Sequence, residues 1–186
     1  FDLVIESVVE RNEVKHALLT GLEAVVGDDC ILATNTSSLS VTGLAAAARR
    51  PERVAGFHFF NPVPLMKVVE VIGGLLTDAA VVERLAAIAR RLGHRPVVAT
   101  DTPGFLVNHA GRAYGTEALR IVQAGVASFA DVDRVMTEAA GFRMGPFELF
   151  DLTGLDVSQT VMETIYHQYY EEPRYRPSPI GAQRRT

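Results

Sequence analysis

Short apolar runs alternate with helical patterns through the first hundred residues. This alternation is typical of a mostly parallel sheet covered by helices, because a parallel crossover needs a connection long enough to hold a helix. We expect five strands, at residues 3–5, 31–33, 53–60, 67–72 and 96–99. We expect helices at residues 13–26, 41–48 and 77–92, the last of them capped by Thr77 and ended by Gly93.

The pattern changes after residues 101–104, where runs of strand length stop and only helical spacing continues. Ser128 and Asp131 resemble a capping pair at the start of one helix, and residues 172–179 are expected to be irregular. The expected helices cover residues 105–124, 128–141 and 156–171, with one more beginning at Pro146. The chain is therefore predicted to form an α/β domain of residues 1–100 and an all-α domain of residues 101–186.

Composition excludes several classes of partner. The formal charge is −4, from 18 basic and 22 acidic residues, whereas a nucleic-acid-binding surface usually needs clustered Lys and Arg. The longest uncharged stretch, residues 30–48, contains seven Ser, Thr and Asn residues, too many for a membrane helix. Cys30 is the single cysteine and has no partner for an intramolecular disulfide, which favours a reducing, cytoplasmic setting.

Two ionisable side chains interrupt apolar strands of the first domain. His58 lies within the run of residues 56–60, and Glu70 lies within the run of residues 68–72. Each needs a polar partner if it is buried. If the two strands are neighbours, Glu70 favours the protonated imidazole of His58 and fixes its tautomer, as a general acid or base requires. The alternatives are a histidine satisfied within the core and a structural buried ion pair.

The polar loop of residues 35–38 follows a predicted strand, at the place where α/β sheets bind ligands. Its alternative role is to cap the helix at residues 41–48. Asn108 lies early in the second domain, where a surface amide is the simpler interpretation. The sequence contains no Gly-x-Ser-x-Gly elbow, His-Glu-x-x-His motif, cysteine pair or Walker loop, so we expect no metal site.

Five longer motifs make the chain similar to a known family. They are residues 35–39 (Asn-Thr-Ser-Ser-Leu), 56–62 (Gly-Phe-His-Phe-Phe-Asn-Pro), 67–71 (Lys-Val-Val-Glu-Val), 101–108 (Asp-Thr-Pro-Gly-Phe-Leu-Val-Asn) and 144–149 (Met-Gly-Pro-Phe-Glu-Leu). In order and spacing they resemble the signatures of the 3-hydroxyacyl-CoA dehydrogenases, most of all the bacterial 3-hydroxybutyryl-CoA type, from residue 1 to about residue 180. Residues 108–115 depart from the Leu-rich helix of many relatives, which leaves the acyl chain length open.

The resemblance implies a Rossmann-like NAD-binding domain followed by an all-α dimerisation domain. It implies NAD-dependent oxidation of (3S)-3-hydroxyacyl-CoA to 3-oxoacyl-CoA, in fatty-acid or related acyl-CoA degradation or in butanoate metabolism. The rival interpretations are a non-catalytic dimerising relative and another NAD-dependent hydroxy-acid dehydrogenase. A homodimer is also favoured by six aromatic residues, more than a small helical unit easily buries alone. These are Phe105, Phe147, Phe150, Tyr166, Tyr169 and Tyr170.

The resemblance also assigns roles to individual residues. His58 is implied to be the catalytic acid/base and Glu70 its orienting partner, while Ser37 and Asn108 lie at the substrate oxygen. The implied NAD contacts are Glu10, Lys15 and Asn35, and the implied substrate-binding residues are Ser37, Asn61 and Asn108.

Members of this family begin with a glycine-rich phosphate loop and an acidic ribose-binding residue. Both are absent from these 186 residues, in which no two glycines are separated by a single residue. The chain also opens on residues 1–6 as a strand already under way, without an initiator Met. We therefore expect a fragment that lacks the first half of the Rossmann domain and a closing segment, and that alone binds NAD weakly and is inactive.

Overall fold

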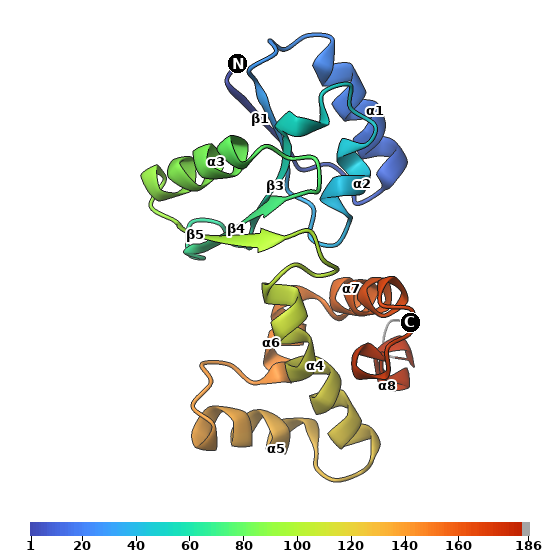
Figure 1. Cartoon of the computed structure of the whole chain (residues 1–186). Helices are drawn as coiled ribbons and strands as arrows, with labels where there is room; N and C mark the ends of the chain where they lie inside the picture. The colour runs from blue at the N-terminus through green and yellow to red at the C-terminus, as the bar shows by residue number, and fades with distance from the viewer. Residues whose placement is uncertain (184–186) are drawn as a thin grey trace. The chain divides into compact units, whose positions relative to one another are not determined.

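The computed structural model describes residues 1–183. It consists of two compact units, an α/β unit of residues 1–106 and a helical unit that begins at Val107 (Figure 1). The predicted order, α/β followed by all-α, is confirmed. Among the helices of residues 1–183, none combines the length and the apolar character that a membrane crossing needs.

The first unit is built on one five-stranded sheet, in the order β1-β2-β3-β4-β5. The strands are β1 (Leu3–Glu6), β2 (Ile31–Thr34), β3 (Val54–Phe59), β4 (Val68–Gly73) and β5 (Arg95–Thr100). The pairs β1–β2, β2–β3 and β4–β5 are parallel, and β3–β4 is antiparallel. The sheet is therefore mostly parallel, as predicted, with one reversal at β3–β4.

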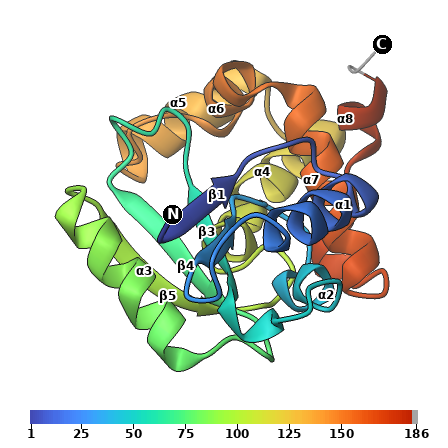
Figure 2. The same cartoon turned by 90° about the horizontal axis from the view of Figure 1, so that it is seen from above.

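Helices cover both faces of this sheet (Figure 2). They are α1 (Asn12–Glu23) and α2 (Val41–Ala45) on one face and α3 (Ala79–Arg91) on the other, with a short 3-10 turn at Pro51–Arg53. Because side chains alternate along a strand, Phe57 and Val69 pack towards α3 in one core cluster. Leu32 and Val54 point the other way and pack with Leu19 of α1 in a second cluster.

The second unit is helical throughout its regular structure. Its elements are α4 (Val107–Gln123), α5 (Phe129–Arg134), a π-helical turn (Val135–Ala139), α6 (Pro146–Thr153), α7 (Leu155–Gln168), a 3-10 turn (Pro173–Tyr175) and α8 (Pro179–Gln183). Leu119, Phe150 and Met162 form its core. The predicted capping pair is confirmed, because Ser128 Oγ accepts from the Asp131 N–H at 3.1 Å and donates to its carboxylate at 2.7 Å.

Three local predictions were wrong. Asp78, not Thr77, precedes α3, because the Thr77 hydroxyl already donates to the Val54 carbonyl at 2.6 Å and accepts from the Gly74 N–H at 2.9 Å. Residues 172–179 are not wholly irregular, since residues 173–175 form a 3-10 turn and α8 begins at Pro179. Phe105 belongs to the first unit rather than to the helical one, and α4 begins two residues after it.

Gly56 lies where β3 and β4 approach closely. A Cβ atom at this position would lie 2.8 Å from Ile72 Cβ, an atom fixed by the backbone of the neighbouring strand. We expect Gly56→Ala to lower the free energy of unfolding by about 1–3 kcal/mol, the usual cost of overpacking. Denaturant unfolding measures this, with Gly27→Ala as the control, since a Cβ at Gly27 meets nothing within 4 Å. Equal stability of the two variants would contradict the close approach.

Candidate active site

His58 and Glu70 face each other across the antiparallel β3–β4 pair. The strand register places them directly opposite, and His58 Nδ1 lies 2.7 Å from Glu70 Oε2. Both residues are buried, His58 at 5% exposure and Glu70 at 0%. The predicted neighbouring strands are confirmed, and alternation along them turns both side chains away from α3.

The carboxylate determines which imidazole nitrogen carries a proton. An ionised carboxylate only accepts hydrogen bonds, so Nδ1 of His58 must be the donor to Glu70. In the neutral ring, Nε2 then holds the lone pair, and it has no hydrogen-bond partner within residues 1–183. The ring packs against Phe60 and Phe105, with centroid separations of 4.5 and 5.8 Å. This arrangement presents a base of fixed tautomer in a fixed orientation.

The second oxygen of Glu70 is also occupied. The Leu106 N–H donates to Glu70 Oε1 at 2.8 Å. Each carboxylate oxygen therefore has a donor, as a fully buried charge requires. Glu70 is held in place independently of His58, which is what an orienting group needs.

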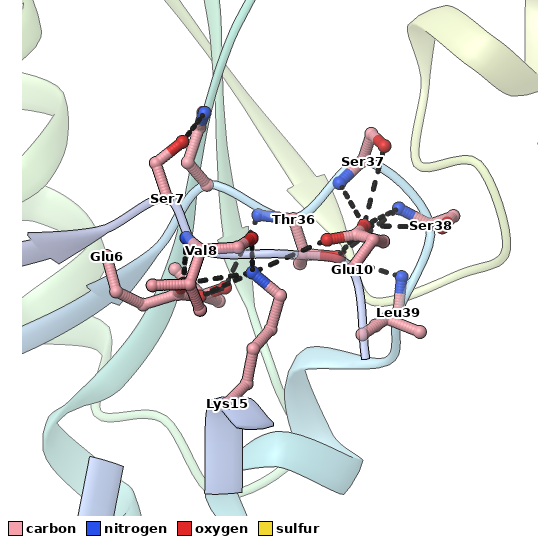
Figure 3. Close-up of polar contacts among 11 residues, drawn as sticks. Glu6, Ser7, Val8, Glu10, Lys15, Thr36, Ser37, Ser38 and Leu39 are labelled. Carbon is pink, nitrogen blue, oxygen red and sulfur yellow. Dashed lines mark hydrogen bonds and ion pairs between the residues drawn. The ribbon is translucent and has the colours of Figure 1, made fainter. Parts of the chain in front are cut away.

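Ser37 lies in the loop that follows β2, and a carboxylate organises that loop (Figure 3). Glu10 Oε1 accepts from the Ser37 N–H at 2.8 Å and the Ser38 N–H at 3.2 Å. The hydroxyl groups of Thr36, Ser37 and Ser38 also donate to this oxygen. Two loops at the carboxyl ends of parallel strands are joined in this way, because Glu10 follows β1 and Ser37 follows β2.

Lys15 connects Glu10 to a second, buried carboxylate (Figure 3). Its ammonium lies 2.9 Å from both Glu6 oxygens and 3.4 Å from Glu10 Oε2, and it donates to the Val8 carbonyl at 3.2 Å. Glu6 also accepts from the Thr34 hydroxyl. Lys15 is 1% exposed, so its charge is used inside the protein to hold the two carboxylates.

Asn35 connects the ends of two strands. Its Nδ2 donates to Ser7 Oγ at 3.0 Å, and its Oδ1 accepts from the Phe59 N–H at 2.8 Å. Phe59 follows His58 directly, so Asn35 ties the Ser37 loop to the strand that carries the histidine.

The two remaining predicted residues, Asn61 and Asn108, belong to other elements of the chain. Asn61 is exposed in the connection between β3 and β4, where its peptide bond to Pro62 is cis. Asn108 lies in the first turn of α4, in the second unit. Contact of either residue with a substrate stays a prediction.

Sequence reasoning missed Glu6, Thr34 and Thr36, which build the network around Ser37. All three are buried, and each bonds to a group distant in sequence. A charged residue at the end of an otherwise apolar strand, as in Leu-Val-Ile-Glu, was the one available signal for Glu6.

A cavity in the helical unit does not include this network. It has a volume of about 440 Å³ and is lined by residues 120, 123 and 124 of α4 and by residues 176–179. None of the predicted site residues lines it, so the candidate site is defined by the His58–Glu70 pair rather than by this cavity. No group of three or more potential metal ligands occurs within residues 1–183.

The ionisation of Glu10 links the loop to pH. Burial alone would raise the pKa of Glu10, but hydrogen bonds from Thr36 and the Ser37 N–H, with the charge of Lys15, hold the pKa below its usual value of 4.5. A lowered folded pKa means that the stabilisation is present above the unfolded pKa and is lost as the pH falls through the folded pKa.

We therefore expect Glu10→Gln to be less stable than the wild type at pH 7, with a difference that narrows as the pH falls below about 4.5. Urea unfolding at a series of pH values measures the difference. A gap that stays constant down to pH 3 would show that the carboxylate charge does not stabilise the loop.

Comparison with known proteins covers both units. Residues 1–102 match the family model described as 3-hydroxyacyl-CoA dehydrogenase, NAD binding domain, and residues 104–184 match the model of the C-terminal domain. The chain is 48% identical over 179 residues to 3-hydroxyadipyl-CoA dehydrogenase of Escherichia coli K12, covering 96% of this chain and 38% of the relative. It is 44% identical over 178 residues to human mitochondrial hydroxyacyl-coenzyme A dehydrogenase, covering 96% of this chain and 57% of the relative.

Comparison with a solved structure supports the same family fold. The crystal structure of 3-hydroxybutyryl-CoA dehydrogenase from Escherichia coli K12 superposes with a TM-score of 0.95 at 46% identity, covering 98% of this chain and 39% of the other. The chain thus spans well under two thirds of the length of these relatives. With both of its units matched in order, the chain belongs to the 3-hydroxyacyl-CoA dehydrogenase family.

Proposed function

We propose that the full-length protein, meaning the natural polypeptide in which these residues occur, oxidises (3S)-3-hydroxyacyl-CoA to 3-oxoacyl-CoA with NAD. The observation that carries the proposal is the buried His58–Glu70 pair in a member of this family. The relatives named for 3-hydroxyadipyl-CoA and 3-hydroxybutyryl-CoA support an acyl-CoA substrate. A cytoplasmic location is proposed on the single, buried and unpaired Cys30.

In the proposed mechanism, Nε2 of His58 accepts the proton of the substrate hydroxyl. The imidazolium that forms is stabilised by the Glu70 carboxylate. The Leu106 N–H already holds this carboxylate in position, so it need not move during the reaction. The Ser37 hydroxyl exchanges its 3.4 Å bond to Glu10 Oε1 for a hydrogen bond to the substrate oxygen as the carbonyl forms, and Asn108 donates a second hydrogen bond to that oxygen. In the reverse direction, the protonated His58 returns the proton to that oxygen.

NAD, when bound, accepts the hydride from the carbon that carries the hydroxyl. The loops after β1 and β2 suit its nicotinamide side, because ligands of α/β sheets bind beyond the carboxyl ends of parallel strands. We propose that Glu10 and Asn35 contact the cofactor there and that Lys15 acts through the carboxylates it holds, since its own ammonium is buried. The 186 residues contain no glycine-rich pyrophosphate turn, so alone they are proposed to bind NAD weakly.

We expect His58→Gln to lower kcat by at least about a hundredfold, because proton transfer is lost while little volume changes. Glu70→Gln should lower kcat by about tenfold or more, since an amide has one accepting oxygen and Glu70 serves two donors. Steady-state kinetics of the full-length protein measure both. The control is His167→Gln, an exposed histidine of α7, which should retain wild-type turnover.

Oxidation of NADH that depends on acetoacetyl-CoA is the assay that tests the function. Turnover by the wild type and its loss in His58→Gln would support the dehydrogenase. No turnover with acetoacetyl-CoA, but turnover with a hydroxy acid that lacks CoA, would favour another NAD-dependent dehydrogenase. A wild-type protein inactive with all of these substrates would favour the non-catalytic dimerising relative.

We also propose a homodimer through the helical unit. Among the six aromatic residues, Phe105 does not support this proposal, because it belongs to the first unit. Tyr170 of the helical unit does support it, because its side chain is 95% exposed. Stronger support comes from aliphatic side chains, since Leu149, Leu152 and Val157 of α6 and α7 are 37%, 69% and 56% exposed.

Sedimentation of the full-length protein at micromolar concentration should therefore show a dimer, and Leu152→Glu should shift it to the monomer by placing a charge in the contact. Leu75→Glu is the control, because Leu75 is 89% exposed in the first unit. A wild-type monomer, or a dimer equally sensitive to both variants, would contradict the proposed contact.

A further inference from the structure

Asp101 follows β5 and bonds to the beginning of α2, about sixty residues earlier in the chain. Its carboxylate accepts from the Ser40 hydroxyl at 2.8 Å, the Val41 N–H at 2.9 Å and the Thr42 N–H at 2.6 Å. Three donors converge on one carboxylate, so this is a firm attachment. Ser40, the first of these donors, lies three residues beyond Ser37 along the chain.

The Ser37 loop is therefore held from both ends by carboxylates of other segments. Glu10 accepts hydrogen bonds from the N–H groups of Ser37 and Ser38, and Asp101 accepts hydrogen bonds from residues 40–42. Between them, the Leu39 N–H donates to Thr36 Oγ1 at 2.9 Å. With both anchors in place, the backbone that carries the Ser37 hydroxyl has little freedom to shift.

The segment that begins at Asp101 also reaches the His58–Glu70 pair. Gly104 and Phe105 both have positive φ, +77° and +47°, and the turn they make brings the Leu106 N–H to Glu70. This conformation is unfavourable for a non-glycine residue, and the packing of the buried Phe105 ring against His58 offsets that strain. Residues 101–106 thus connect the two regions. Asp101 bonds to residues 40–42, directly after the Ser37 loop, and the Leu106 N–H bonds to Glu70.

We propose that Asp101 is a positioning residue for the Ser37 hydroxyl, acting through the first turn of α2. The inference deepens the proposed function and rests on it. A donor to the substrate oxygen must be placed within about 0.5 Å of the productive geometry, and removal of such a donor lowers kcat by about 10²–10³. Partial displacement of Ser37 should lower kcat by about tenfold.

The direct test is Asp101→Asn in the full-length protein, which keeps the shape but turns an NH2 group towards N–H donors. Asp133→Asn is the matched control, because Asp133 caps α6 in the same way, accepting from the Phe147 N–H at 2.9 Å and the Glu148 N–H at 3.0 Å. Both variants should lower the melting temperature. We expect only Asp101→Asn to lower kcat for acetoacetyl-CoA reduction about tenfold, with the KM for NADH unchanged within about twofold.

A double-mutant cycle separates positioning from general destabilisation. If Asp101 acts through Ser37, Asp101→Asn should lower kcat about tenfold in the wild-type background and less than about twofold in the Ser37→Ala background. Equal effects in both backgrounds, or a fall in kcat with Asp133→Asn as large as that with Asp101→Asn, would overturn the inference and leave the proposed function standing.

If Asp101→Asn does not fold, Ser40→Ala removes one of its three bonds and should show the same non-additivity with Ser37→Ala at a smaller size. Additive effects of Ser40→Ala would also overturn the inference. A wild-type protein without acetoacetyl-CoA-dependent activity overturns the proposed function and this inference together. The two failures are therefore distinguishable.

Discussion

A carboxylate fully removed from water needs a donor on each oxygen, and Glu70 takes its donors from two segments. One is the imidazole of His58 on the next strand, and the other is the Leu106 N–H at the end of the turn after β5. The antiparallel pairing of β3 with β4 brings this histidine and this glutamate directly opposite each other. The local geometry of the candidate site follows from the need to satisfy this one buried charge.

The same requirement shapes the loop beside it, with the roles reversed. There the backbone supplies N–H donors, and the carboxylates of Glu10 and Asp101 come from other segments to accept them. Lys15 neutralises part of the charge that gathers in this region by bonding to Glu10 and to buried Glu6. Such buried polar networks specify one arrangement of their members when every group is satisfied. A rigid loop carrying Ser37 is the result.

Much of this could be predicted from residue order. Apolar strands interrupted by His58 and Glu70 indicated a paired, buried site, since an isolated charge could not stay there. The role of Asp101 could not be predicted, because it depends on bonds across about sixty residues that leave no local pattern. The capping role expected of Thr77 failed for a similar reason, since its hydroxyl oxygen already accepts from the Gly74 N–H and its proton is donated to the distant Val54 carbonyl. Competition between distant residues for the same hydrogen-bond donors and acceptors cannot be predicted from a local sequence pattern.

The period-two alternation of β4 has a further consequence, for the changes of length that descendants of this sequence can accept. The connection between β3 and β4 runs over residues 60–67 along the surface, and such connections absorb insertions and deletions at little cost. A slip of one residue within β4 itself would instead turn Glu70 towards α3 and set Val69 or Val71 beside His58. Natural variation in length should therefore accumulate in the connection and be excluded from the strand, so that the spacing between histidine and glutamate drifts while their pairing does not.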